Sequence, residues 1–470
     1  MAWPDLRAFL DALDRQGDLL RIKDEVDWAY EAAALTRQTS DIEGPALLFE
    51  RVKDSAYPLL SGLFAARRRV ALALEVTESN LFDAYREREE RPRDAVIVEK
   101  GPCQEIVLEG DQVDLGTLPI MRHYEKDGGR YVTAGLQVAR HPVTGRRNVA
   151  IYRMLLLDRK RLTVYTPPGR HLRAIIEKNL DDGRPTEIAT VIGAEPVCQI
   201  ATQARVPLGS DEFAIAGGLR GEPVPLVRCK TVDLEVPATA EMIIEARTIP
   251  GELRPDGPFG EYPGTYSPVK QAPVMEVTAI TMRRGAMYQN ALTGMPMTEN
   301  HWMMQPAATA MVYREAYKIS PEIRAVHVTP GGATRHHVVI AIRKRHNLEP
   351  RNLGLALLAA PLGAKQVVVV DEDIDVFDPL QVEWAINTRV QADRDVIIIP
   401  NLYSPTLDPS APGERTSAKM AIDATAPLGE LERYTPPQIP GADRVRLDRY
   451  LEGWRRPANP RDRGGTSRSD

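Results

Sequence analysis

Three apolar runs in the last third of the chain constrain its fold most strongly. His337–Ile342, Gln366–Asp371 and Asp395–Pro400 are rich in apolar and β-branched residues, and the helix-like segments Leu353–Leu362 and Pro379–Arg389 separate them. Strands that alternate with helices pair in parallel through right-handed crossovers, because each helix returns the chain to the starting end of the sheet. The sequence therefore predicts an α/β region here, with these three strands paired in parallel.

The chain before this region has a different pattern. Apolar residues at helical spacing between Asp5 and Gly17 predict an amphipathic helix, and the strand-like Leu19–Ile22 follows it. Short β-type runs with Gly and Pro between them then predict a sheet-rich middle domain, a barrel or a sandwich. These runs are Glu105–Leu108, Arg130–Val138, Asn148–Leu157, Thr190–Ile192, Pro225–Val227 and Met275–Met282. A helical pattern over Pro306–Tyr317 leads into the α/β region.

Charge and composition favour a small-molecule ligand. The 470 residues include 60 basic and 65 acidic residues that are interspersed, so there is no basic stripe for nucleic acid and no polybasic membrane patch. Cys103, Cys198 and Cys229 are far apart and odd in number, which argues against a disulfide framework and against a zinc site. No apolar run approaches the roughly 20 residues that cross a bilayer. We therefore expect a cytoplasmic protein, with a disordered or loosely docked tail from about Arg455.

The segment 256–266 reads Asp-Gly-Pro-Phe-Gly-Glu-Tyr-Pro-Gly-Thr-Tyr and carries two acids. Its glycines and prolines interrupt regular structure, so we expect Asp256 and Glu261 on a bent loop. Two carboxylates held together cannot both ionise at low cost, so one of them keeps its proton near neutral pH. The pattern therefore indicates acid chemistry, although solvated acids on a turn would give the same sequence.

Polar residues in the middle region supply a set of possible metal ligands. Asn148, His171 and Glu212 offer two oxygens and one nitrogen, which suits Mn²⁺ or Mg²⁺ better than a thiophilic metal. Arg153 follows Asn148 by five residues on a predicted strand, so the two side chains can act together only if the strand bends. Taken singly, each residue is also compatible with a structural role.

Motifs for other cofactors are missing. The sequence has no Gly-x-Gly-x-x-Gly after a strand, no Walker loop and no Gly-x-Ser-x-Gly elbow. His336 and His337 begin a predicted strand, where successive side chains point to opposite faces, so they do not suggest a shared metal.

The order Asn148, Arg153, His171, Glu212, Asp256, Glu261 resembles the UbiD family of decarboxylases, whose members act on ferulic, hydroxybenzoic and heteroaromatic acids. The similarity runs to about residue 435. Further motifs that carry it are Val236–Glu241, Val368–Asp375, Trp384–Arg389 and Lys419–Thr425.

This resemblance implies a three-domain architecture. It places an N-terminal α/β domain at 1–105, a split β-barrel that binds prenylated FMN at 106–305, and a C-terminal α/β oligomerisation domain at 306–440, followed by an arm or tail at 441–470. By the same resemblance the protein forms a homodimer or a homohexamer and obtains its cofactor from a flavin prenyltransferase.

The resemblance also implies the site. Asn148, His171 and Glu212 would hold a Mn²⁺-type ion that bridges to the cofactor phosphate, with K⁺ nearby. The flavin would be lined by Ile151, Tyr152, Arg153, Arg170 and Lys365.

In this family the prenylated flavin is the electron sink for loss of CO₂ from an sp² carbon. Glu261 matches the proton donor, and Arg153 would bind the substrate carboxylate or the neighbouring acids. Asp256 would complete this network, although glutamate is the usual family residue at its position.

The expected activity is a reversible, non-oxidative decarboxylation of an aromatic, heteroaromatic or α,β-unsaturated acid. Two alternatives remain open, a non-catalytic flavin or phosphate-ligand binding protein on the same scaffold and a divalent-metal hydrolase. The Met-rich segment 293–304 is either a pocket wall or ordinary core, and His301 within it is a candidate for binding a second polar substituent of the substrate.

Overall fold

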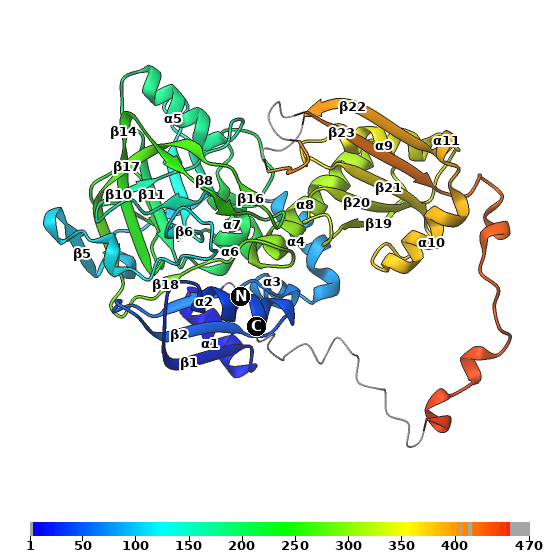
Figure 1. Ribbon diagram of the computed structural model, residues 1–470, viewed down its shortest axis with the longest axis horizontal. Helices are drawn as coiled ribbons and strands as arrows, with labels where there is room; N and C mark the ends of the chain where they lie inside the picture. The colour runs from blue at the N-terminus through cyan, green and yellow to red at the C-terminus, as the bar shows by residue number, and fades with distance from the viewer. Residues whose placement is uncertain (1–2, 404–406, 412–415, 452–470) are drawn as a thin grey trace, which may run out of the picture. The chain divides into compact units, whose positions relative to one another are not determined.

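The computed structural model describes residues 3–403, 407–411 and 416–451 (Figure 1). The chain divides into two compact units, residues 1–425 and 426–470. The described part of the second unit contains three short 3₁₀ turns, η5 (Leu431–Tyr434), η6 (Ala442–Arg444) and η7 (Leu447–Tyr450). The tail predicted from Arg455 lies outside the described residues.

The predicted N-terminal helix is present as α1 (Leu6–Arg15). The Asp5 carboxylate caps it by accepting a hydrogen bond from the Ala8 N–H at 2.9 Å. Gly17 follows with a φ of 71°, a left-handed conformation that glycine adopts without strain. The sequence therefore predicts both ends of this helix correctly.

The first sheet combines strands from distant parts of the sequence. In spatial order it consists of β1 (Leu19–Val26), β2 (Ala46–Val52), β3 (Leu59–Ser61) and β18 (Tyr288–Gln289). The helices of this part of the chain are α2 (Glu31–Asp41), α3 (Arg67–Ala73) and α4 (Leu81–Glu89). Because β18 pairs with β3 in parallel, the N-terminal sheet is completed by residues near the end of the middle region.

The middle region is sheet-rich, as the short β-type runs predict. Its main sheet has the order β10–β17–β14–β11–β7–β8, and β5 also pairs with β17. The bounds are β5 (Ile106–Glu109), β7 (Leu136–Arg140), β8 (Arg147–Ile151), β10 (Arg161–Thr163), β11 (Glu187–Ile192), β14 (Met242–Asp256) and β17 (Lys270–Met282). Among the described residues the end strands β8 and β10 do not pair with each other, so the sheet is not a closed barrel.

Two features of this sheet differ from the sequence prediction. The longest strand, β14, is not predicted, because its Pro and Gly residues coincide with a register shift between Thr248 and Leu253. The predicted strands Arg130–Val138 and Asn148–Leu157 are each divided, into β6 (Tyr131–Val132) and β7 and into β8 and β9 (Met154–Leu155).

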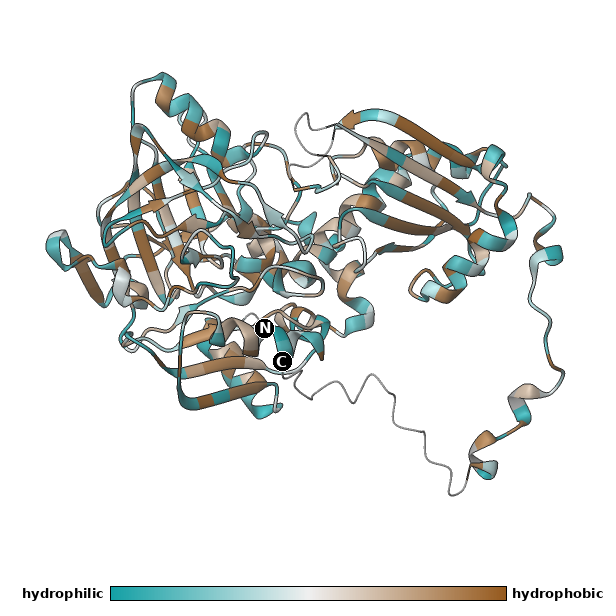
Figure 2. Cartoon of the chain, in the orientation of Figure 1, coloured by the Kyte–Doolittle hydropathy of each residue, from teal (hydrophilic) through white to brown (hydrophobic). Residues whose placement is uncertain are grey.

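Both faces of the main sheet are buried. Leu136, Val138 and Val191 pack with residues of α6 (Pro196–Ala201) and α7 (Glu212–Arg220) on one face. Alternate positions pack with α5 (His171–Asp181) on the other face. Figure 2 shows the resulting hydrophobic strands in the middle of this region. Three short strands form a separate small sheet, β4 (Val96–Ile97), β12 (Pro225–Arg228) and β13 (Glu235–Pro237).

The last region is an α/β layer with sheet order β19–β20–β21–β23–β22 (Figure 1). Its strands are β19 (Ile323–Val328), β20 (His337–Ile342), β21 (Gln366–Asp371), β22 (Val396–Tyr403) and β23 (Thr416–Ala424). α8 (Glu299–Tyr317) and α9 (Glu349–Ala359) cover one face, and α10 (Pro379–Arg389) covers the other. The short helix α11 (Ala392–Asp395) precedes β22.

The predicted α/β class of this region is confirmed, but the pairing of its third strand is wrong. β22, which contains the predicted Asp395–Pro400 strand, lies at the edge and is antiparallel to β23. The third parallel strand is β23, which carries Lys419 and Asp423 and therefore lacks the continuous apolar pattern. The predicted helix Pro306–Tyr317 begins earlier, at Glu299, with Pro306 inside it. Within the described ranges, no helix has both the length and the apolar composition to span a membrane.

Candidate functional site

A cavity of about 630 Å³ brings together most of the residues singled out from the sequence. It lies within the first unit, and its walls come from the main sheet, from the starts of α5, α7 and α8, and from the turn before β20. The predicted residues that line it are Asn148, Ile151, Tyr152, Arg153, Arg170, His171, Glu212 and Glu261. Asp256 and Lys365 are not among the lining residues.

The gap between β8 and β9 lets Asn148 and Arg153 face the same cavity. β8 ends at Ile151 and β9 begins at Met154, so Arg153 lies outside regular strand structure. The Tyr152 N–H donates to the side-chain oxygen of Gln137 at 2.6 Å instead of to a strand neighbour. This is the bend that joint action of the two side chains requires.

The Arg153 guanidinium is the centre of a buried ionic network. Its Nε and Nη2 contact Asp256 Oδ1 at 2.9 and 2.8 Å, and its Nη1 donates to Glu261 Oε1 and, at 2.7 Å, to Ser267 Oγ. The second oxygen of Asp256 accepts a hydrogen bond from Thr163 Oγ1 at 2.5 Å. The shorter aspartate at this position therefore reaches Arg153 directly, without a bridging group.

The two acids have different environments. The Asp256 side chain is fully buried behind Arg153, whereas that of Glu261 is 13 % exposed and faces the cavity. Burial raises the pKa of Glu261, and nearby Asp256 raises it further, although Arg153 opposes both effects. Glu261 is thus the acid that can reach a ligand while keeping a proton.

The bent loop expected for both acids is present only in part. Asp256 is the last residue of β14, and the loop begins at Gly257. Phe259–Gly260 forms β15, which pairs with β16 (Tyr266–Ser267) in a small hairpin that contains Glu261. A strand end thus holds Asp256, and a hairpin presents Glu261.

Aromatic rings surround the Arg153 guanidinium. Its central carbon lies 4.5 Å from the Tyr165 ring centroid and 5.1 Å from that of Phe259. Such stacking fixes the plane of the guanidinium while its edge remains free for hydrogen bonds. Tyr165 and Phe259 also line the cavity, so the cation is presented from an apolar wall.

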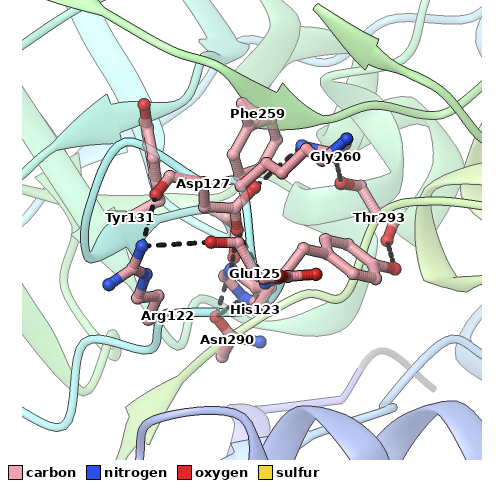
Figure 3. Close-up of polar contacts among 12 residues, drawn as sticks. Arg122, His123, Glu125, Asp127, Tyr131, Phe259, Gly260, Asn290 and Thr293 are labelled. Atoms are coloured by element: carbon pink, nitrogen blue, oxygen red, sulfur yellow. Dashed lines mark hydrogen bonds and ion pairs between the residues drawn. The ribbon is translucent and has the colours of Figure 1, made fainter.

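A segment that the sequence analysis did not identify holds the acidic loop in place (Figure 3). Asp127, which is 1 % exposed, accepts the Gly260 N–H on Oδ1 at 3.0 Å and the Tyr124 N–H on Oδ2 at 2.9 Å. The Tyr131 hydroxyl accepts the Gly257 N–H at 2.9 Å. Asp127 and Tyr131 thus bind the backbone on both sides of Phe259.

Further contacts connect this segment to the chain before α8. Tyr124 Oη donates to the Thr293 carbonyl at 2.5 Å, and Thr293 Oγ1 donates to the Gly260 carbonyl. Buried His123 contacts the side-chain oxygen of Asn290 at 2.9 Å (Figure 3). Spacing along the sequence gives no signal for this cluster, because its contacts join two segments that lie more than 100 residues apart.

Asn148, His171 and Glu212 come together at one end of the cavity. Asn148 Nδ2 lies 3.1 Å from Glu212 Oε1 and 3.4 Å from His171 Nδ1. Glu212 Oε2 accepts the Val149 N–H at 2.7 Å. Burial raises the pKa of Glu212 to about 8, and burial together with Arg170 lowers the pKa of His171.

These three residues fit a divalent cation. Asn148 Oδ1 is buried without a hydrogen-bond partner. A half-turn of the amide would direct this oxygen toward the His171 nitrogen and the Glu212 carboxylate, which gives three converging acceptors. A neutral imidazole and two oxygens suit Mn²⁺ or Mg²⁺. No group of three or more His, Cys, Asp and Glu side chains in the described ranges is placed to hold a metal ion, so Asn148 is an essential member of this set.

Close helix packing fixes the position of Glu212. Glu212 is the first residue of α7, and the Asp211 carboxylate caps this helix through the Phe213 N–H at 3.0 Å. Farther along α7, a Cβ on Gly218 would lie 2.6 Å from the Arg91 carbonyl oxygen. Only glycine lets α7 approach this segment so closely.

Two predicted residues have other partners. Lys365 Nζ forms an ion pair with Asp408 at 2.9 Å and donates to Ser410 Oγ at 2.6 Å. His301 is buried in the first turn of α8, where Nδ1 accepts the Thr298 N–H at 3.0 Å and Nε2 contacts the Tyr262 carbonyl at 2.7 Å. Both His301 nitrogens are thus engaged, and the structure does not place this ring in the cavity. Its neighbours Asn300, Met303 and Met304 do line the cavity, as expected for a pocket wall.

Two arginines that the sequence analysis did not single out also line the cavity. Arg205 lies between α6 and α7, and Arg335 lies in the turn before β20. With Arg170 they form a group that we call the arginine wall. Arg335 lowers the pKa of Arg205, with a further contribution from burial. Burial lowers the pKa of Arg170, with a further contribution from Arg335.

Comparison with known families identifies the scaffold. Residues 10–89, 95–296 and 301–424 match the N-terminal, Rift-related and C-terminal domains of 3-octaprenyl-4-hydroxybenzoate carboxy-lyase, named UbiD. The chain is 36 % identical over 434 residues to anhydromevalonate phosphate decarboxylase of Methanothermobacter thermautotrophicus, covering 91 % of this chain and 98 % of that protein.

Solved structures agree with this assignment. The UbiD-class enzyme HmfF from Pelotomaculum thermopropionicum in complex with FMN is 41 % identical, with a TM-score of 0.88 over 95 % of this chain and 100 % of that chain. An evolved dimeric form of HmfF in complex with prenylated FMN is 39 % identical, with a TM-score of 0.85 over 96 % of this chain and 100 % of that chain. With its three consecutive domains, the chain belongs to the UbiD family of carboxy-lyases.

Proposed function

We propose that this protein is a reversible, non-oxidative decarboxylase of an aromatic, heteroaromatic or α,β-unsaturated carboxylic acid, with prenylated FMN as its cofactor. The observation that carries the proposal is the network in which Arg153 connects buried Asp256 to cavity-facing Glu261. The decarboxylase activity of one relative and the flavins bound in the HmfF structures support the same reaction class.

The residues around the cavity fit this cofactor. The cavity volume of about 630 Å³ is within the usual range for ligand and cofactor sites. Asn148, His171 and Glu212 would hold Mn²⁺ or Mg²⁺ against the cofactor phosphate, with K⁺ nearby, while Ile151–Arg153 and Arg170 would line the ring system. Lys365 would need to leave Asp408 to join them. When bound, the prenylated flavin supplies the electron sink that loss of CO₂ from an sp² carbon requires.

The protein side chains have separate tasks. Arg153 orients the substrate carboxylate through Nη2, which contacts Asp256 Oδ1 at 2.8 Å but makes no hydrogen bond within the described residues. Asp256 and Thr163 hold Arg153 in place from the buried side. Glu261 delivers its carboxyl proton to the carbon that has lost CO₂, and in the reverse direction it removes that proton.

Glutamine at position 261 tests the proton transfer. Glu261→Gln should lower decarboxylation by about 100-fold or more, because a positioned general acid contributes at least that factor. The bound flavin spectrum should not change. Exposed Glu125→Gln, in the segment next to the cavity, is the matched control and should remain active. Release of CO₂ from a panel of cinnamic and heteroaromatic acids measures the effect, and full turnover by Glu261→Gln would exclude this role.

The cofactor requirement separates the proposal from its alternatives. Protein produced together with a flavin prenyltransferase should bind coloured cofactor and decarboxylate acids, and protein produced without it should be inactive. A metal-dependent hydrolase built on Asn148, His171 and Glu212 would be active without colour. A non-catalytic flavin-binding protein would bind coloured cofactor but would decarboxylate no acid, whether it is produced with or without the flavin prenyltransferase.

Further parts of the proposal concern organisation. We place the N-terminal α/β domain at 1–105, the split-barrel flavin domain at 106–305, the α/β oligomerisation domain at 306–440 and a tail beyond it. The protein would act in the cytoplasm as a homodimer or homohexamer. Light scattering coupled to gel filtration distinguishes these two assemblies.

A further inference from the structure

The arginine wall carries more positive charge than its surroundings neutralise. Among the described residues, no carboxylate forms an ion pair with Arg170, Arg205 or Arg335, and Arg335 Nε is buried without a hydrogen-bond partner. Within the described part of the chain, the acids that line the cavity are Glu212 and Glu261, and Arg153 already pairs with Glu261.

Burying like charges together is unfavourable unless an anion joins them. The charge of Arg335, burial and the charge of Arg170 all lower the pKa of Arg205, so the wall is unfavourable in the ligand-free protein. Aromatic contact offsets little of this cost, since among the residues that the structure describes only Arg335 of the three lies over a ring, that of Tyr262 at 5.0 Å. The arrangement is therefore suited to a ligand that brings several negative charges.

The cofactor alone does not balance this charge. A phosphate monoester carries close to two negative charges, and the divalent cation proposed between Asn148, His171 and Glu212 offsets them. The substrate carboxylate that is lost faces Arg153. At least one guanidinium of the wall thus remains for another anionic group.

We propose that the substrate carries a second anionic group, a carboxylate or a phosphate, which Arg335 and Arg205 bind in the cavity that they share with Arg153. This inference rests on the proposed function and specifies its substrate class. Tyr262 follows Glu261 in sequence, and its ring lies under the Arg335 guanidinium. A ligand that spans from Arg153 to Arg335 would thus place its reacting carbon beside Glu261.

Binding to the flavin-loaded enzyme tests the subsite without turnover. The probes are benzoate, terephthalate and 4-phosphonobenzoate, which share one ring and differ in the second group. Terephthalate or 4-phosphonobenzoate should bind about tenfold or more tightly than benzoate, as expected for one charge-assisted contact. Which of the two binds more tightly decides between carboxylate and phosphate. Equal binding of all three would overturn the proposal.

Arginine variants locate the contact. R335Q and R205Q should each reduce the preference for the second anionic group about tenfold, while benzoate binding and flavin content stay unchanged. Exposed Arg159, which pairs with Asp114 outside the cavity, gives the control R159Q, which should keep the full preference. Loss of flavin in R335Q and R205Q without loss of preference would assign the wall to the cofactor phosphate and overturn the proposal.

Thermal unfolding provides a readout that does not depend on activity. Because R335Q removes one of the like charges that line the cavity, the ligand-free variant should unfold at the same temperature as the parent protein or higher. Added terephthalate should stabilise the parent and not R335Q. If terephthalate stabilises the parent and not R335Q but no tested acid is decarboxylated, the proposed reaction fails and the subsite stands. If monoanionic acids are decarboxylated and the arginine variants change neither binding nor unfolding, the subsite fails and the reaction stands.

Discussion

Replacement of Asp127 by asparagine tests how the acidic loop is held. Both oxygens of this buried carboxylate accept backbone N–H groups, from Gly260 at 3.0 Å and from Tyr124 at 2.9 Å. Asparagine keeps one acceptor and places an amide NH₂ against the other N–H. The change removes a hydrogen bond to a charged group and leaves buried donors unpaired, each worth about 1–3 kcal/mol.

We therefore expect Asp127→Asn to lower the free energy of unfolding by about 3 kcal/mol. Urea denaturation measures this change, with an unchanged m-value as the sign that the folded state remains compact. Decarboxylation should fall as well, because Glu261 directly follows Gly260 and loses its fixed position. Flavin content should remain, since Asp127 does not line the cavity.

Asp158→Asn is the matched control. Its carboxylate also accepts two backbone N–H groups, from Lys160 at 3.0 Å and from Arg161 at 2.9 Å, but the side chain is 42 % exposed. Water can replace these contacts, so the control should lose no more than about 1 kcal/mol. If Asp127→Asn costs no more than Asp158→Asn, or leaves turnover unaffected, the buried carboxylate does not position the loop.

Four further substitutions test other parts of the structure. Arg153→Lys should reduce decarboxylation about 100-fold with flavin retained, because an ammonium cannot contact Asp256, Glu261 and Ser267 together; CO₂ release near parent levels would refute this. Gly260→Ala should disrupt the loop, because its Cβ would collide with the Tyr124 ring. The free energy of unfolding, measured by urea denaturation, should therefore fall, and an unchanged value would contradict this. His171→Ala should weaken Mn²⁺ binding about tenfold or more in a titration followed by electron paramagnetic resonance. Burial raises the pKa of Glu299 to about 7, so the stability of the parent protein is highest, with respect to this group, below pH 4.5 and falls by about 3 kcal/mol as pH rises through 7. Glutamine cannot ionise, so the free energy of unfolding of the parent should fall relative to that of Glu299→Gln over this range, and parallel stability curves would contradict this.

Local patterns in the sequence predict the elements better than their pairing. The α/β alternation and the N-terminal helix are visible because apolar spacing and capping residues are local signals. The antiparallel edge strand β22 is not predictable in this way, since its pairing depends on β23, whose polar residues hide it. The interruption of β8 before Arg153 likewise depends on the distant Gln137 side chain.

The site shows the same division. The family resemblance names the ordered residues from Asn148 to Glu261, and all of them except Asp256 line one cavity. It does not name Asp127, Arg205 and Arg335, because each acts through a partner that is distant in sequence. The contribution of these three side chains to the site depends on which residues face them, and only the fold determines this.

The pairing of β18 with β3 has a consequence for dividing this protein. Residues 1–105 expressed alone would expose the edge of β3, where unpaired backbone groups invite aggregation. The carboxylate of Glu299 adds a second link, since it accepts the Phe64 N–H at 3.4 Å and the Leu292 N–H at 3.0 Å. The N-terminal sheet is thus finished only after some 290 residues have been synthesised, so its final folding must wait for the middle region to emerge.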